Sequence, residues 1–250
     1  MKKILAILLV LIIATPIFAV DFQTTLQAAK EGYAEAQFTL GETYYSGQGV
    51  TQDYTEAYKW YRKAAEQGHK QAQATLGVLY YEGKGVTQDY AESIKWLLLA
   101  AEQGHAYAQA SLGYMYQNGQ GVAQDHAEAI KWYRLAAEQG NAEAQFNLGY
   151  MYYSGIGVTK DHAEAVKWFH KAAEQDHAYA QDGLGLMYNT NNQFRLVVGK
   201  VEVAAQSMLG YMYQYGEGVT KDITQAAHWY RIAAEQGDEF AQEMLKELEY

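Results

Sequence analysis

The 250-residue sequence contains no cysteine, and its only proline is Pro16. Without cysteine the chain has no disulfide, no cysteine nucleophile and no site for an N-terminal lipid, so its stability must come from burial alone. With a single proline and 23 glycines, we expect regular elements separated by glycine-containing connections. A composition that is 49% apolar and includes 5 tryptophans and 23 tyrosines can supply the buried core.

Positive charge is also scarce, because 19 lysine and arginine residues stand against 29 aspartate and glutamate residues. The formal net charge of −10 repels a phosphate backbone, so we do not expect nucleic acid as a partner.

Only one long apolar run is present, from Ile4 to Ala14, and two lysines precede it. This layout predicts a signal peptide over residues 1–19, cleaved after Ala19. The alternative is an uncleaved anchor, but a membrane span needs about 20 apolar residues and Pro16 arrives too early. We therefore expect a periplasmic or secreted protein without stable membrane insertion. Cleavage would leave 17 basic residues against 29 acidic ones, a net charge of about −12.

The rest of the chain is organised by a recurring Leu-Gly pair. The pair occurs at Leu40-Gly41, Leu76-Gly77, Leu112-Gly113, Leu148-Gly149, Leu184-Gly185 and Leu209-Gly210. Four of the five steps are 36 residues and the last is 25, which is typical of a repeat array. The expected units are a half repeat at 20–32, repeats at 33–68, 69–104, 105–140 and 141–176, a truncated repeat at 177–201, a repeat at 202–237 and a C-terminal capping helix at 238–250.

Each full repeat reads as two helices. In the first repeat, Ala36, Leu40 and Tyr44 form one stripe of a helix expected over residues 34–46, which Gly47 ends. A second helix is expected to begin where Asp53 and Glu56 form a capping-box pattern. Its apolar face would contain Ala57, Trp60, Tyr61 and Ala64. One helix pair cannot bury both stripes, so neighbouring pairs must stack into an all-α solenoid.

These motifs carry a specific resemblance. The pattern Ala-x-x-x-Leu-Gly-x-x-Tyr-x-x-Gly-x-Gly-Val, followed by Asp-x-x-x-Ala-x-x-Trp-x-x-x-Ala-Ala-x-x-Gly, is met from Ala36 to Gly68 and, with Ser93 for one alanine, from Ala72 to Gly104. It resembles the Sel-1-like repeat family, a relative of the tetratricopeptide repeats. The resemblance covers most of the chain and implies an α/α superhelical solenoid that serves as a scaffold for protein assembly.

The segment 189–203 departs from this pattern, because it lacks the glycine loop, the capping aspartate and the tryptophan. Residues 194–198 and 201–203 are rich in β-branched residues or alternate, which is not helical patterning. Two interpretations are open: a degenerate second helix or an inserted recognition loop. In either case we expect Trp168 and Phe169 to lose cover, the solenoid to kink or break here, and proteases to cut first within 190–200.

No chemical site emerges from the sequence. The Gly-x-Gly pairs lack the Gly-Lys-Ser/Thr of a phosphate loop, and the recurring Asp/Glu pairs are explained by helix capping. Equivalent histidines of stacked repeats lie about 10 Å apart, too far to share a metal ion. With no cysteine, Ser-x-x-Lys or Gly-x-Ser-x-Gly, we expect no catalytic residue, no metal and no cofactor.

The sharpest expectation concerns a binding groove. Residues one and four positions after the glycine of the Leu-Gly pair vary between repeats and are rich in tyrosine, and with residues one turn earlier they form a second stripe on the first helix. By similarity to tetratricopeptide repeats this stripe would line a concave wall. The candidate residues are Phe38, Tyr45, Tyr81, Tyr114, Phe146, Tyr150, Tyr153 and Tyr211.

The sequence therefore favours a non-catalytic interaction scaffold of the bacterial cell envelope. It would bind a peptide or protein segment along the tyrosine-rich groove, and its acidic residues would favour neutral or basic partners. The alternative is an enzyme, a weak cell-wall or β-lactam hydrolase of the kind linked to cysteine-rich relatives in the family. Against it, the chain has neither those cysteines nor a serine motif.

Overall fold

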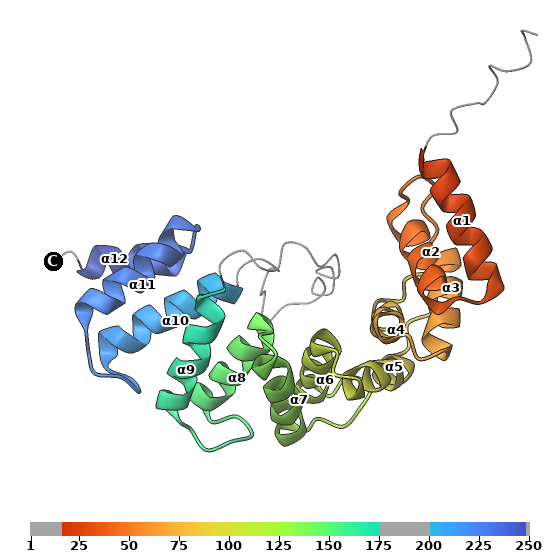
Figure 1. Cartoon of the computed structure of the whole chain (residues 1–250). Helices are drawn as coiled ribbons and strands as arrows, with labels where there is room; N and C mark the ends of the chain where they lie inside the picture. The colour runs from red at the N-terminus through yellow and green to blue at the C-terminus, as the bar shows by residue number, and fades with distance from the viewer. Residues whose placement is uncertain (1–16, 176–200, 249–250) are drawn as a thin grey trace, which may run out of the picture. The chain divides into compact units, whose positions relative to one another are not determined.

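The structure is a computed structural model that describes residues 17–175 and 201–248. It forms two compact units, residues 1–88 and 89–250, which are considered separately (Figure 1). The expected signal peptide falls almost entirely in residues 1–16, and most of the irregular segment falls in residues 176–200. Both lie outside the described residues, so cleavage and the protease-sensitive site stay predictions.

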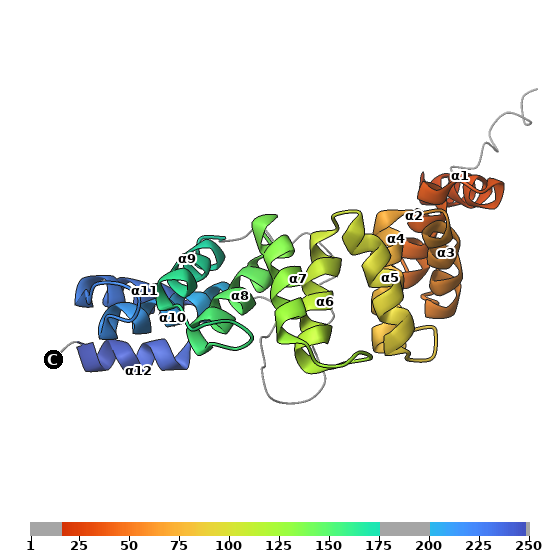
Figure 2. The same ribbon diagram turned by 90° about the horizontal axis from the view of Figure 1, so that it is seen from below.

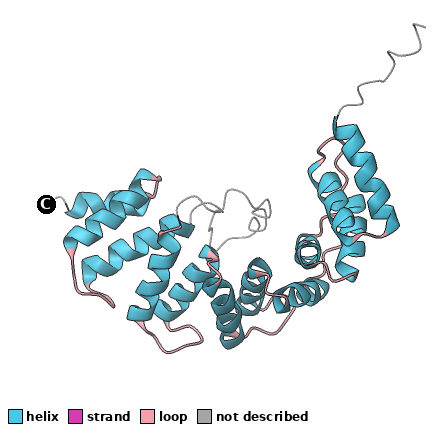
Figure 3. Ribbon diagram, in the orientation of Figure 1, coloured by secondary structure: helices cyan, strands magenta, loops and turns pink. Residues whose placement is uncertain are grey.

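In the described ranges the chain forms helices joined by short connections, without β-strands (Figure 3). The first unit contains α1 (Ile17–Glu31), α2 (Ala34–Ser46), α3 (Tyr54–Glu66) and α4 (Lys70–Glu82). The second contains α5 (Tyr90–Glu102), α6 (Ala106–Asn118), α7 (His126–Glu138), α8 (Ala142–Ser154), α9 (His162–Ala173), α10 (Val201–Tyr215), α11 (Ile223–Glu235) and α12 (Glu239–Leu248). Helix α2 has the bounds expected from the sequence. None of these helices is long and apolar enough to cross a membrane.

The helices alternate between two roles within each repeat. We call α2, α4, α6, α8 and α10 the A helices, and α3, α5, α7, α9 and α11 the B helices. Successive helices pack side by side within each unit, and in the second unit α8 also contacts the neighbouring A helices α6 and α10 (Figures 1 and 2). The fold is therefore the predicted all-α solenoid of helix-turn-helix repeats with a 36-residue period.

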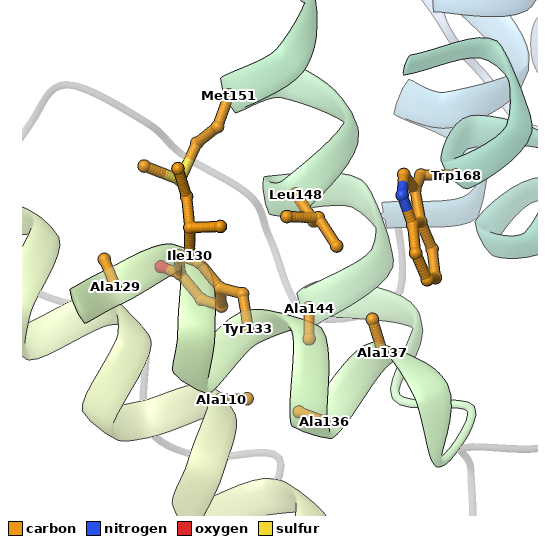
Figure 4. Close-up of a cluster of buried hydrophobic side chains, with 10 residues drawn as sticks. All are labelled: Ala110, Ala129, Ile130, Tyr133, Ala136, Ala137, Ala144, Leu148, Met151 and Trp168. Atoms are coloured by element: carbon orange, nitrogen blue, oxygen red, sulfur yellow. The ribbon is translucent and has the colours of Figure 1, made fainter. Parts of the chain in front are cut away.

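The core lies between the A and B helices. Figure 4 shows one cluster, in which Tyr133 of α7 lies among alanines and the side chains of Leu148 and Met151 from α8. The two tyrosine positions differ in burial. Tyr61, Tyr133 and Tyr230, which follow the tryptophan of each B helix, are fully buried. The A-helix tyrosines, expected in the core, are only half-buried.

Those half-buried A-helix tyrosines instead reach toward the preceding repeat. The hydroxyls of Tyr58 and Tyr80 lie 2.9 Å apart, and Arg134 donates a hydrogen bond to the hydroxyl of Tyr152. The tryptophans also differ in burial, since Trp168 is buried and Trp60 is half-buried, although a lysine ammonium group lies 4.1 Å from the ring centroid of each. The hydrogen-bonding hydroxyl explains why the A-helix tyrosines stay at the boundary of the core rather than inside it.

The glycine of the Leu-Gly pair is a packing requirement of the A–B interface. A Cβ atom at Gly113 would lie 2.6 Å from Cδ1 of Tyr133, and one at Gly41 would lie equally close to Tyr61. The ring of the B helix thus rests directly on the backbone of the A helix. The 36-residue recurrence of Leu-Gly follows from this contact rather than from a turn.

The aspartates before the B helices are N-caps, as the sequence predicts. Asp53 accepts hydrogen bonds from the backbone N–H groups of Thr55 and Glu56 at 2.9 and 3.0 Å. The reciprocal half of the expected capping box is absent from this helix start, because Glu56 pairs with a lysine and the N–H of Asp53 donates to the carbonyl of Tyr44. Each cap therefore also fixes its B helix to the A helix before it.

A buried glutamine staple joins successive repeats. Gln145 of α8 is 4% exposed, donates to the carbonyl of Ala137 on α7 at 3.0 Å, and accepts from Gln175 after α9 at 2.6 Å. The same three-helix arrangement recurs at Gln37, Gln109 and Gln206. Each of these glutamines bonds to two neighbouring helices at once, so the glutamine staple fixes how one repeat stacks on the next.

The expected break of the solenoid is wrong within the second unit. Helix α10 packs on α9 as α8 packs on α7, so Trp168 and Phe169 remain 5% and 0% exposed rather than losing their cover. Residues 201–203, whose alternating pattern did not suggest a helix, form the first turn of α10. The reason is that α10 takes the place next to α9 that an A helix of the truncated repeat would otherwise fill.

Candidate functional site

Three of the expected groove residues lie in the first unit. Phe38 and Tyr45 are on α2 and Tyr81 is on α4, and all three are half-buried. Phe38 stacks on the ring of His69 with centroids 4.7 Å apart. Tyr45 makes an edge contact with Tyr54, the first residue of α3, at 5.1 Å. These side chains therefore have one packed face and one face that reaches the surface.

Five expected residues lie in the second unit. Tyr114 is on α6, Tyr150 and Tyr153 are on α8 and Tyr211 is on α10, and each is half-buried. Phe146 differs, because it is 9% exposed and packs against Phe169 with ring centroids 5.5 Å apart. Phe146 therefore belongs to the core and leaves little surface for a partner.

Two positions of the stripe are occupied by glutamines that accept hydrogen bonds from buried tyrosines, a role that the sequence did not reveal. Buried Tyr133 donates a hydrogen bond from its hydroxyl to Gln117 at 2.8 Å, and buried Tyr230 donates to Gln214 at the same distance. In both repeats the acceptor occupies the stripe position four residues after the glycine. Burial raises the pKa of Tyr133 well above its ordinary value, so the hydroxyl stays protonated and needs an acceptor.

In the first repeat a different residue accepts the hydrogen bond of the buried tyrosine. There the hydroxyl of Tyr61 donates to the carboxylate of Glu42, one position after the glycine, and Tyr45 keeps the other stripe position. In the fourth repeat the B-helix residue is Phe169, which has no hydroxyl, and Tyr153 takes the place of the glutamine. The pairing of glutamine with a buried tyrosine was visible in the sequence as a correlation between the two helices.

Charge is divided between the two rows of helices in the second unit. The three A helices α6, α8 and α10 contain nine tyrosines and no lysine or arginine, while their acidic residues are Glu143 and Glu202. The B helices α5, α7, α9 and α11 hold the basic residues Lys95, Lys131, Arg134, Lys167, Lys171 and Arg231. The A row is therefore rich in tyrosine, poor in charge and free of lysine and arginine, whereas the B helices carry acidic residues beside these basic ones.

A cluster of polar and aromatic groups lies where three elements meet in this row. The ring of Tyr153 on α8 stacks on His162 of α9 with centroids 5.0 Å apart. Glu217, in the connection after α10, places Oε2 3.8 Å from Nδ1 of His162. Burial, followed by the nearby carboxylate of Glu217, raises the pKa of Tyr153, and Tyr211 contributes to the same shift. Tyr211 in turn packs on Tyr215, which is 53% exposed.

Loop glycines and His69 have structural roles in the turns and at the helix ends. Gly47 and Gly49 have φ values of 72° and 78°, which other residues adopt at a cost. At the next connection, a side chain on Gly85 would collide with the carbonyl of Tyr54. His69 accepts a hydrogen bond at Nδ1 from the N–H of Ala72 at 3.2 Å, and so caps α4. Over residues 17–175 and 201–248 no three metal-binding side chains gather.

The sequence profile of the Sel1 repeat matches this chain five times. The matched residues are 34–69, 70–105, 106–141, 142–177 and 203–238. The interval between the last two matches corresponds to the 25-residue irregularity, after which α10 continues the stack on α9. A search of the curated proteins returned no match.

Solved structures provide further relatives. A protective antigen of uropathogenic Escherichia coli strains, displaying an SLR fold, is 40% identical over 90% of this chain and 50% of its own, with a TM-score of 0.63. A Sel1 repeat protein of Oxalobacter formigenes is 32% identical over 91% of this chain and 59% of its own, with a TM-score of 0.73. This chain thus spans between half and three fifths of the length of these relatives.

Proposed function

The chain belongs to the Sel1 repeat family, and from this premise we propose that it is a non-catalytic interaction module that binds a segment of another protein along its A helices. Sel1 repeat proteins are commonly scaffolds for protein interactions. We further propose that it acts outside the bacterial cytoplasm, after removal of residues 1–19.

The observation that carries this proposal is the composition of the A row in the second unit. Three neighbouring helices contain nine tyrosines, of which Tyr114, Tyr150, Tyr153 and Tyr211 lie on the predicted stripe. Tyrosine offers a large contact area with little conformational freedom to lose, and it is enriched in protein interfaces. The rigid stacking of the repeats holds these rings at fixed spacing, which lowers the entropic cost of binding.

A hydrolase finds less support in the described residues. His69 caps α4 and His162 stacks on Tyr153, so both rings have a role in packing. Burial raises the pKa of Tyr133 and Tyr230, which keeps these hydroxyls protonated and unable to accept a proton as a general base would. These observations support the interaction module better than the hydrolase.

The test is capture of a partner from a bacterial envelope extract with the chain lacking residues 1–19. The captured protein is then titrated against Tyr114→Ala, Tyr150→Ala and Tyr153→Ala variants, alone and combined. We expect affinity to fall stepwise, by about 1–2 kcal/mol for each ring that contacts the partner. Circular dichroism at the assay temperature confirms that each variant is folded.

The matched control is Tyr33→Ala, which removes a tyrosine that is 64% exposed and lies between α1 and α2, outside the stripe. This variant should bind as the wild type does. A captured protein whose affinity is unchanged by all three stripe variants would contradict the proposal. Hydrolytic activity that one substitution abolishes would instead favour the enzyme.

A further inference from the structure

Glu217 is an acidic residue in an aromatic setting. Its basic neighbour is the imidazole of His162 at 3.8 Å, and no lysine or arginine of the described residues forms an ion pair with it. Its Oε2 atom is shielded from solvent and has no hydrogen-bond partner among the described residues, while the side chain as a whole is 29% exposed. The nearest basic group in its own loop, Lys221, is exposed and forms no ion pair with it. A carboxylate that has lost part of its hydration without gaining a lysine or arginine partner is costly, and a guanidinium or ammonium group supplied from outside would lower that cost.

The first unit shows how the same position is filled when the chain provides the cation itself. There Lys84 occupies the place between the two loop glycines that Glu217 occupies after α10. Its Nζ lies 5.9 Å from the ring centroids of both Tyr45 and Tyr54, and it pairs with Glu82 at 2.8 Å. A cation, two rings and a carboxylate together make a complete cation–π site.

The second unit has the rings and the carboxylate but no lysine or arginine between them. Tyr153 and His162 stand at the positions of Tyr45 and Tyr54, and Glu217 replaces the lysine. Tyr211 and the exposed Tyr215 extend the aromatic surface on α10, with ring centroids 4.6 Å apart. The two sites thus have rings at equivalent positions, and the second lacks the positively charged side chain that a partner could supply.

We propose that Tyr153, Tyr211, Tyr215 and Glu217 form a seat for a cationic side chain, above all an arginine, of the bound protein segment. The planar guanidinium stacks on tyrosine while its N–H groups reach the carboxylate, which an ammonium group does less well. The absence of lysine and arginine from α6, α8 and α10 leaves this cation unopposed along the row. This inference rests on the proposed interaction function and specifies the chemistry of its partner.

The experiment uses a displayed library of random peptides, selected on the chain without residues 1–19 at physiological ionic strength. Peptides that bind the wild type should be rich in arginine. Replacing that arginine with citrulline, its neutral counterpart, should weaken binding, and so should Glu217→Gln, by about tenfold or more in each case. Glu217→Lys, which copies Lys84, should abolish binding.

The matched control is Glu235→Gln, which makes the same charge change at an exposed position of α11 in the same repeat. It should leave affinity unchanged, which separates the seat from general attraction to an acidic protein. Peptides that require Tyr150 but lack basic residues and ignore Glu217→Gln would overturn the seat and leave the interaction function standing. Selection of no peptide that depends on the A row would overturn both.

Discussion

The side-chain amide of Gln206 donates a hydrogen bond to the carbonyl of Ala173, 33 residues earlier, at 3.4 Å. In the regular repeats the same bond spans 8 residues, as between Gln145 and Ala137. The difference is the 25 residues by which the interval between the Leu-Gly pairs of α8 and α10 exceeds one 36-residue period. The stack of helices therefore keeps its register across the irregular segment.

Deleting residues 177–201 should preserve the fold of the second unit. The deletion joins Asp176 to Glu202 and restores the 8-residue spacing of the glutamine bond. Because the connection becomes shorter, we expect the free energy of unfolding to stay the same or to rise by up to about 2 kcal/mol. Thermal unfolding followed by circular dichroism measures this.

A deletion of equal length over residues 141–165 is the control, because it removes α8 and should unfold the unit. If the deletion of 177–201 lowers the melting temperature by more than about 10 °C, the continuous stacking of α10 on α9 is refuted.

Gly113→Ala should destabilise the protein even though alanine favours helices over glycine by about 1 kcal/mol. The new methyl group would lie 2.6 Å from the ring of Tyr133, which is 1% exposed and cannot move aside. We expect a net loss of about 1–3 kcal/mol in urea unfolding. The loss measured for the double variant with Tyr133→Leu should be smaller than the sum of the losses of the two single variants. A double-variant loss equal to that sum would show that the ring does not cause the loss.

The repeat period and the capping aspartates could be predicted because each depends on one short stretch of sequence. The helix starting after Asp53 is an example, since its cap is decided within three residues. The kink could not be judged in the same way. It depends on which of two segments carrying a Leu-Gly pair, 177–189 or 202–214, packs on α9, and local patterns do not rank two similar sequences.

The stripe on the A helices stays a prediction as a binding surface. Of its residues, Phe146 packs in the core against Phe169, a contact between two helices that the pattern within one helix does not reveal. Glu217 was missed because its neighbours Tyr153 and His162 belong to other helices. The repeat period predicts that helix pairs stack, but it does not predict which side chains of neighbouring repeats come into contact.

Gln145→Leu should cost more than its burial suggests. The substitution removes two hydrogen bonds between helices, the one to the carbonyl of Ala137 and the one from the amide of Gln175, at about 1 kcal/mol each. Gln175→Leu is the matched control, because Gln145 then keeps its bond to Ala137 and the loss should stay below about 1 kcal/mol. Equal losses in chemical denaturation would show that the staple is not what holds the two repeats together.

Stability should fall in mild acid partly because of His170 on α9. Its Nε2 lies 3.3 Å from the hydroxyl of Tyr213 and its ring packs against Trp229 at 5.2 Å. Burial lowers the pKa of His170, and the opposing effect of Glu174 only reduces that shift.

A lowered pKa means that the folded protein binds the proton less well than the unfolded chain, in which histidine titrates near pH 6.5. The contribution of His170 is therefore complete above about pH 6.5 and is lost as the pH falls from there through the folded value. His170→Asn should flatten the dependence of melting temperature on pH between 7.5 and 5.0. His228→Asn, at an exposed position of the neighbouring α11, should leave the wild-type slope in place. Identical slopes for the wild type and His170→Asn would show that His170 has the same pKa in the folded and unfolded states, and the proposed contribution of His170 to acid sensitivity would be wrong.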